Sequence, residues 1–218
     1  MHLDFERIWP SLPYILEGIP VTLAYTGVSL GLGFLWGALL AFCKVSHISP
    51  LKWFATFYTS IFRGTPLLLQ LFLIYFASPQ IFGYNISVWE AGILTFTLNS
   101  GAYISEHIRG GINSVDKGQM EAALSLGISY SFIMKDIILP QAVRNILPSL
   151  VNEAIDLLKE SALISTIGGA DILRRTYIVA NEKYLFLEPL LIAGGVYYIL
   201  VMILTGSARI LEKKLKTS

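Results

Sequence analysis

Five polar residues between positions 152 and 160 have the types and spacing to bind a small ionic solute: Asn152, Glu153, Asp156, Lys159 and Glu160. At ~100° per residue in an α-helix, all five fall within roughly 120° of one face. With three carboxylates and one ammonium, the face has a net charge of −2 and favours a cationic ligand. In one interpretation Glu153 or Asp156 contacts the solute, and Asp156 is then the better candidate for specificity. In the other, Asp156 and Lys159 pair at i,i+3 and the stripe only joins helices.

The chain that positions this stripe has the composition of an integral membrane protein. Of its 218 residues, 54% are hydrophobic and only 14% are Asp, Glu, Lys or Arg, against roughly 25% in an average soluble domain. A net charge of +1 argues against a nucleic-acid partner and leaves the lipid bilayer as the expected surroundings. A single cysteine and three scattered histidines predict neither a disulfide framework nor a metal site.

Gaps between charged residues predict the transmembrane helices. No charged residue occurs in 19–42, 64–89 or 189–208, and about 20 apolar residues are enough for a helix to cross a bilayer. The shorter uncharged stretch 91–105 can cross if its ends extend into the interfaces, and a fifth helix, about 145–170, carries the charged stripe. We therefore expect an all-α integral membrane protein with five transmembrane helices in a single domain, 1–218.

The distribution of Lys and Arg predicts the orientation of these helices. Five crossings place the termini on opposite sides of the membrane. A cytoplasmic C-terminus puts ten basic residues inside and four outside, in agreement with the positive-inside rule. We expect the N-terminus outside, the C-terminus in the cytoplasm, and a long cytoplasmic loop at about 110–144. Long ordered loops are usually functional.

Within this loop the sequence predicts two short helices. The first begins near Glu121 and stops at Gly127, and the second runs from a cap at Ser129 to Ile138. The adjacent Ala122 and Ala123 offer a low surface against which another protein can pack. An amphipathic connector helix without a partner is the alternative interpretation.

The loop resembles the signature of permease subunits of bacterial ABC importers, which reads Glu-Ala-Ala, three residues, Gly, nine residues, Ile-x-Leu-Pro. Every element is present at this spacing: Glu121, Ala122, Ala123, Gly127, Ile137, Leu139 and Pro140. Further segments, including 63–68, 109–112, 118–120 and 159–161, are similar to the polar amino-acid subfamily. The resemblance covers nearly the whole chain, from about residue 14 to the C-terminus.

This resemblance implies a type I ABC importer permease fold in the bacterial cytoplasmic (inner) membrane. Two permease chains, identical or homologous, would form the pathway, and an ATP-binding subunit dimer would dock on their loops. An extracytoplasmic binding protein would deliver a polar amino acid, cationic or glutamine-like, and the helix 121–127 would couple the ATPase to transport. ATP and magnesium would bind to the partner ATPase, since no Gly-Lys dipeptide, and so no phosphate loop, occurs in this chain. We expect no enzyme activity and no cofactor on this chain.

Other polar residues lie inside the predicted helices. Gln70 and Asn99 are expected to form hydrogen bonds between helices, or else to line the pathway. Arg63, Gly64 and Pro66 predict a kink that serves as a hinge or gate, although an arginine extending to the headgroups also explains Arg63.

A self-contained channel or secondary carrier, using the charged stripe as an ion relay, is the alternative function. Secondary carriers commonly contain internal repeats with matched broken helices, and we find no such repeat in this sequence.

Overall fold

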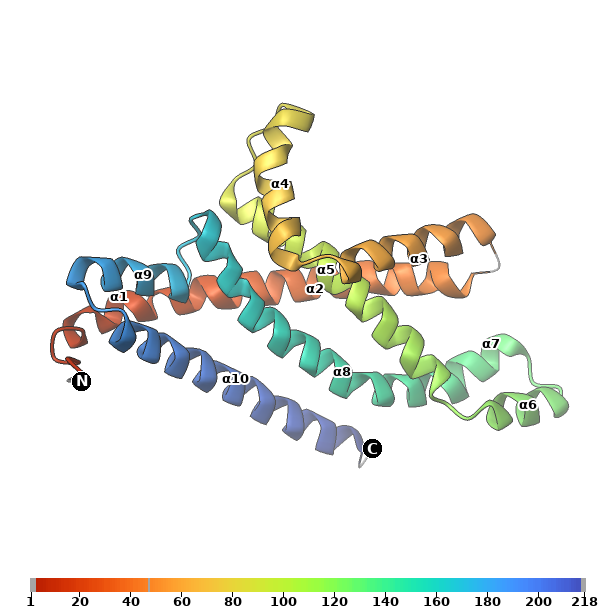
Figure 1. Ribbon diagram of the computed structural model, residues 1–218. Coiled ribbons are helices and arrows are strands. Elements are labelled where there is room, and N and C mark those ends of the chain that lie inside the picture. Colours follow the sequence, from red (N-terminus) through yellow and green to blue (C-terminus); the bar gives the residue numbers. More distant parts are fainter. Residues whose placement is uncertain (1–2, 47, 217–218) are drawn as a thin grey trace.

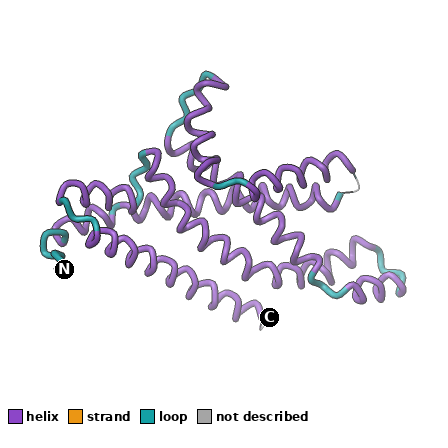
Figure 2. The backbone as a smooth tube through the Cα atoms, in the orientation of Figure 1, coloured by secondary structure: helices purple, strands orange, loops and turns teal. Residues whose placement is uncertain are grey.

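The computed structural model describes residues 3–46 and 48–216, except for the side chains at 211, 212 and 214–216. All regular structure in these ranges is helical, which confirms the all-α part of the predicted fold class (Figures 1 and 2). The elements in chain order are η1 (Trp9–Ser11), α1 (Leu12–Leu16), α2 (Gly18–Val45), α3 (Ser49–Gly64), α4 (Leu67–Phe82), α5 (Val88–Asn113), α6 (Lys117–Ser125), α7 (Tyr130–Phe132), η2 (Ile133–Ile138), α8 (Leu139–Glu160), η3 (Ser161–Ile167), α9 (Ile172–Lys183) and α10 (Leu187–Lys216).

The helices α2 and α5 form the centre of the fold because glycines let them approach closely. A Cβ atom added at Gly37 would lie 2.8 Å from the Gly101 carbonyl oxygen, and one added at Gly101 would lie 2.6 Å from the Trp36 ring. By contrast, a Cβ at Gly27 or Gly31 would meet nothing within 4 Å. Of the glycines on α2, Gly37 therefore packs against α5, whereas Gly27 and Gly31 lie on an open face.

Within the described residues, two helices are long and apolar enough to cross a membrane, Trp9–Val45 and Leu187–Ile210. They contain the predicted spans 19–42 and 189–208. The predicted span 64–89 is wrong as a single helix. Its residues form α4, a loop and the start of α5, and α3 and α4 meet at a bend of 102°. If this bent pair is one span, the number of candidates rises to three.

The helix that carries the charged stripe begins earlier than predicted. α7, the π-helical segment η2 and α8 follow one another without a break from residue 130 to residue 160. Pro140 is the second residue of α8, directly after the π-helical segment η2, and Pro148 lies inside the helix. The two prolines therefore do not bound the helix, and consecutive helical segments, which change direction between α7 and α8 (Figure 1), join the predicted coupling loop to the stripe.

The two ends of the molecule differ (Figure 1). α6 and α7 project from one end, beyond the turn between α2 and α3. The N-terminus, α1 and α9 lie together at the other end. There, the Arg175 guanidinium donates to the Glu17 carboxylate at 2.7 Å and lies over the Tyr14 ring.

Candidate functional site

The loop motif folds as a short helix with a glycine stop. Asp116 caps α6, because its carboxylate accepts a 2.7 Å hydrogen bond from the Gly118 N–H. At the other end Gly127 has a φ of 78°, and the Ile128 N–H donates back to the Ala123 carbonyl. This left-handed residue and the returning bond form a Schellman-type C-cap. The prediction that the helix stops at Gly127 is confirmed. The role of Gly127 in coupling to the ATPase stays a prediction.

The seven signature residues divide between an inner and an outer surface. Ala123 is buried in a small core with Val115, Ile133, Ile138, Ala142 and Ile146, and Ile137 packs at its edge. The other five are exposed: Glu121, Ala122, Gly127, Leu139 and Pro140. The expectation that both alanines offer a surface to a partner is therefore wrong for Ala123, which anchors α6 to its own chain.

Large apolar side chains are exposed around this helix. Leu126 is 80% exposed, Phe132 63% and Tyr130 61%. They lie on α7 and on the turn after α6, the part of the chain that projects from one end of the molecule (Figure 1). An exposed apolar patch on such a projection is typical of a contact with another protein.

Two hydrogen-bonded pairs that the sequence did not predict attach neighbouring elements to α8. One pair holds α6 and the other holds the end of α5. The side-chain amides of Gln119 and Gln141 bond to each other in both directions, and the Asn145 amide donates to the Ser114 hydroxyl at 2.8 Å. Ser129 occupies the cap position of α7, but its side chain accepts no capping bond. The packing and the glutamine pair therefore hold the loop, rather than the expected serine cap.

The charged stripe on α8 lies on a largely open face. Asn152, Asp156, Lys159 and Glu160 are exposed, and the Lys159 ammonium donates to Asp156 at 2.7 Å, as the i,i+3 spacing predicts. Glu153 differs from them because it is buried. One of its carboxylate oxygens lies 3.7 Å from Nε2 of His107 on α5. His107 thus joins the candidate pathway, although its sequence context gave no signal.

Gln70 and Asn99 meet at the bend between α3 and α4. The Gln70 amide donates to the Phe62 carbonyl at 2.9 Å and to the Thr65 carbonyl at 3.1 Å, two groups that the helix break leaves unpaired. The Asn99 amide donates to Phe62 and to Gln70, both at 3.0 Å. Both side chains are buried. The predicted bonding between helices is therefore present, and in this conformation these amides hold the kink at Gly64 and Pro66.

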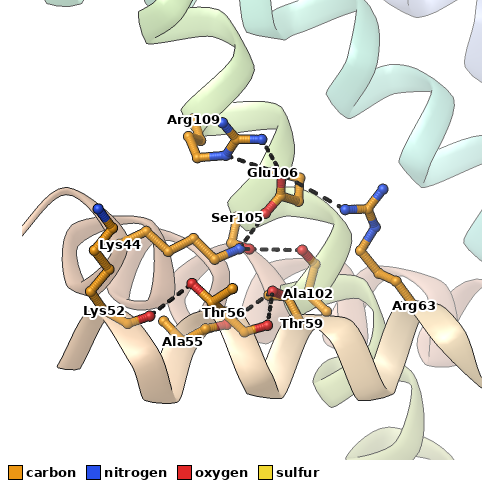
Figure 3. Close-up of polar contacts among 10 residues, drawn as sticks. All are labelled: Lys44, Lys52, Ala55, Thr56, Thr59, Arg63, Ala102, Ser105, Glu106 and Arg109. Atoms are coloured by element: carbon orange, nitrogen blue, oxygen red, sulfur yellow. Dashed lines mark hydrogen bonds and ion pairs between the residues drawn. The ribbon is translucent and has the colours of Figure 1, made fainter. Parts of the chain in front are cut away.

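A cluster of charges joins α2, α3 and α5 (Figure 3). Glu106 and Arg109, at i,i+3 on α5, form an ion pair with N–O distances of 3.1 and 2.7 Å. Beyond this pair α5 continues to Asn113. Lys44 donates to Ser105 at 2.8 Å and also pairs with Glu106, and Arg63 approaches Glu106 at 3.7 Å.

At the opposite end, Asp171 caps α9. Its carboxylate accepts from the Arg174 N–H at 2.9 Å and from the Tyr197 hydroxyl at 3.2 Å. The side chain is fully buried, and this burial raises the pKa of Asp171 to about 6. In the ranges 3–46 and 48–216, no group of three or more His, Cys, Asp or Glu could hold a metal ion.

A helical scaffold with helices long and apolar enough to cross a membrane, a charged stripe on an open helix face and a projecting short helix is typical of a membrane transport subunit. The family model of the binding-protein-dependent transport system inner membrane component matches residues 33–217. The chain belongs to this family, so it is a transport component and not an enzyme, and the resemblance found in the sequence is confirmed.

Named relatives and solved structures agree with this family. The chain is 50% identical over all 218 residues, and over the full relative, to the arginine transport system permease protein ArtQ of Bacillus subtilis. It is 56% identical over 209 residues, 96% of each chain, to the putative glutamine transport system permease protein GlnP of Rickettsia felis. It superposes with a TM-score of 0.93 on an amino acid ABC transporter crystallised with histidines, at 41% identity and covering 98% and 100% of the chains.

Proposed function

We propose that this chain is the permease subunit of an ATP-driven importer of polar amino acids in the bacterial cytoplasmic membrane. Its substrate is cationic or glutamine-like, which relatives named for arginine and glutamine support. Residues 1–218 form one permease domain with five crossings, the N-terminus outside and the C-terminus inside. The lengths of α5 and α8, 26 and 22 residues, support this count. At 1.5 Å per residue they measure about 39 and 33 Å, against a bilayer core of about 30 Å.

The observation that carries the proposal is the connection of α6 to the charged stripe. The exposed apolar patch formed by Leu126, Tyr130 and Phe132 suits docking of an ATP-binding subunit. The signature residues Glu121, Ala122 and Gly127 are exposed as well. Because the helix is unbroken from residue 130 to residue 160, a displacement at the docking end moves the stripe as well. This is how we expect ATP binding in the partner to alternate access to the pathway.

The open face of α8 supports a second permease chain. Asp156, Lys159 and Glu160 are exposed on a helix that crosses the membrane, and charged groups there face protein or water rather than lipid. An identical or homologous chain placed opposite this face encloses a wet pathway. An amino acid released by an extracytoplasmic binding protein then passes along Glu153 and Asp156. Gln70, Asn99, Arg63, Gly64 and Pro66 belong to the wall of this pathway and to its kink.

The proposal is tested with the complete complex in proteoliposomes, containing this chain, its ATPase partner and the binding protein. We expect ATP hydrolysis to rise with arginine or glutamine in a panel of amino acids, and the same solutes to accumulate inside. Vesicles without the ATPase are the control and should not concentrate solute. Uphill uptake by this chain alone would contradict the proposal and favour a secondary carrier.

A further inference from the structure

Arg63 is a cation without a full counter-charge in the described structure. One carboxylate oxygen of Glu106 pairs with Lys44, and the other accepts two bonds from Arg109. Arg63 only approaches that second oxygen, at 3.7 Å. Three cations therefore share one carboxylate, and the cluster has a net charge of +2 (Figure 3). The side chain of Lys44 is 5% exposed, whereas that of Arg63 is 44% exposed and open to a further partner.

The backbone of Arg63 lies beside the middle of α2 rather than at its C-terminal end. α3 folds back beside the C-terminal half of α2 (Figure 1), and the Tyr58 ring lies 5.8 Å from the Trp36 ring. Arg63 follows Tyr58 by five residues, about 7.5 Å along a helix. Its backbone therefore lies near the middle of α2, several turns from the end of that helix. The guanidinium extends from there toward Glu106, and a cation inside the bundle of a membrane protein requires water, protein or an anion around it.

The exposed side of Arg63 leads toward the charged stripe. The guanidinium lies over the Tyr103 ring, 5.3 Å from its centre. His107 follows Tyr103 by one helical turn on the same face of α5 and is 3.7 Å from Glu153 on α8. Arg63 and the Glu153 carboxylate thus lie at the two ends of a short path along α5, with the rings of Tyr103 and His107 between them. This order of charges is complementary to a zwitterion.

We propose that Arg63 binds the carboxylate of the transported amino acid, while the carboxylates of α8 attract its ammonium group. This inference rests on the proposed function, and it assigns the carboxylate end of the substrate to one residue. A guanidinium donates two parallel N–H bonds to a carboxylate, so it orients the solute as well as neutralising it. The kink held by Gln70 and Asn99 fixes the helix end from which Arg63 extends.

The test measures direct binding to the complex of this chain with its ATPase, in nanodiscs and without the binding protein. Radiolabelled L-arginine or L-glutamine is displaced by the unlabelled amino acid or by its α-amide, which lacks the carboxylate charge. The unaltered complex should prefer the acid by about tenfold or more, the range of a charge-assisted bond. Arg63→Gln should reduce that preference to near one, and Arg63→Lys should keep part of it.

Arg109→Gln is the matched control, since Arg109 is similarly exposed and bonds to the same carboxylate. It should keep the preference for the acid. If Arg63→Gln still prefers the acid over the α-amide as strongly as the unaltered complex does, the inference is overturned. This holds even if the variant also weakens the permease dimer. An equal loss of this preference in Arg109→Gln would also overturn the inference. The removal of any cation beside Glu106 would then explain the results of both variants. If the unaltered complex binds neither amino acid, the proposed function fails and the inference with it.

Discussion

The side-chain amide of Asn99 on α5 donates a 3.0 Å hydrogen bond to the side-chain oxygen of Gln70 on α4, and both amides also donate to the carbonyl of Phe62. The bend between α3 and α4 would otherwise leave that carbonyl and the carbonyl of Thr65 unpaired in an apolar setting. The two polar residues therefore stabilise a 102° change of direction. A kink held in this way serves as a rigid corner for the residues beside it.

Gln70→Leu should destabilise the folded chain by about 1 to 3 kcal/mol, because it leaves buried carbonyl oxygens unpaired. The measurement is thermal unfolding of the purified complex in nanodiscs. Gln80→Leu is the matched control, since Gln80 lies at the exposed end of the same helix, and it should change the midpoint little. Equal midpoints for the two variants would show that the network does not stabilise the corner.

The helical class and the stop at Gly127 could be predicted from the sequence, because they depend on local composition and on one backbone conformation. The bend after α3 could be placed at Gly64 and Pro66 for the same reason. The sequence predicted that Gln70 and Asn99 bond between helices, but not that they bond to each other and to the bend, because they meet only after α4 turns back on α5. The predicted span 64–89 failed because a run of uncharged residues does not reveal a break in direction.

Charge pairing across helices was the other feature that the sequence did not reveal. The pair between Glu106 and Arg109 is local, because the two residues are one helical turn apart on α5. Lys44 lies 62 positions from Glu106, and it joins the cluster only because glycines bring α2 against α5. His107 lies opposite Glu153 for a similar reason, the packing of α5 on α8. Neither contact has a spacing that a single sequence shows.

Gly127→Val should uncouple ATP hydrolysis from transport or release the ATPase. A Cβ at this position meets nothing within 4 Å, so the cost comes from the backbone φ of 78°, about 1 to 2 kcal/mol for an ordinary residue. Gly127→Asn is the control, since Asn tolerates this conformation, and it should retain most coupling. The measurements are co-purification of the ATPase and amino-acid-stimulated ATP hydrolysis. Wild-type values for the valine variant would remove Gly127 from the coupling site.

Asp156→Asn should change the preference among amino acids more than it changes assembly. The ion pair with Lys159 is exposed, with side-chain exposures of 58% and 55%, and such pairs contribute only about 0 to 1 kcal/mol. Removing one negative charge should weaken transport of arginine relative to glutamine in competition uptake assays. Asp136→Asn, on the exposed surface of η2, is the control for a lost charge elsewhere. Unchanged selectivity in Asp156→Asn would exclude this residue from the substrate contacts.

Asp171 should make the stability of the folded chain depend on pH. Burial raises its pKa from 3.8 to about 6, so between these values the folded chain binds more protons than the unfolded chain. The unfolding midpoint should therefore fall as the pH rises from about 4 to about 7. Asp171→Asn keeps a capping side chain but cannot ionise, so this part of the pH dependence should disappear. Asp116→Asn, the equivalent change at the exposed cap of α6, leaves Asp171 in place and should retain the dependence. A pH profile that is the same for Asp171→Asn and the unaltered chain would show that this carboxyl does not titrate between the two states.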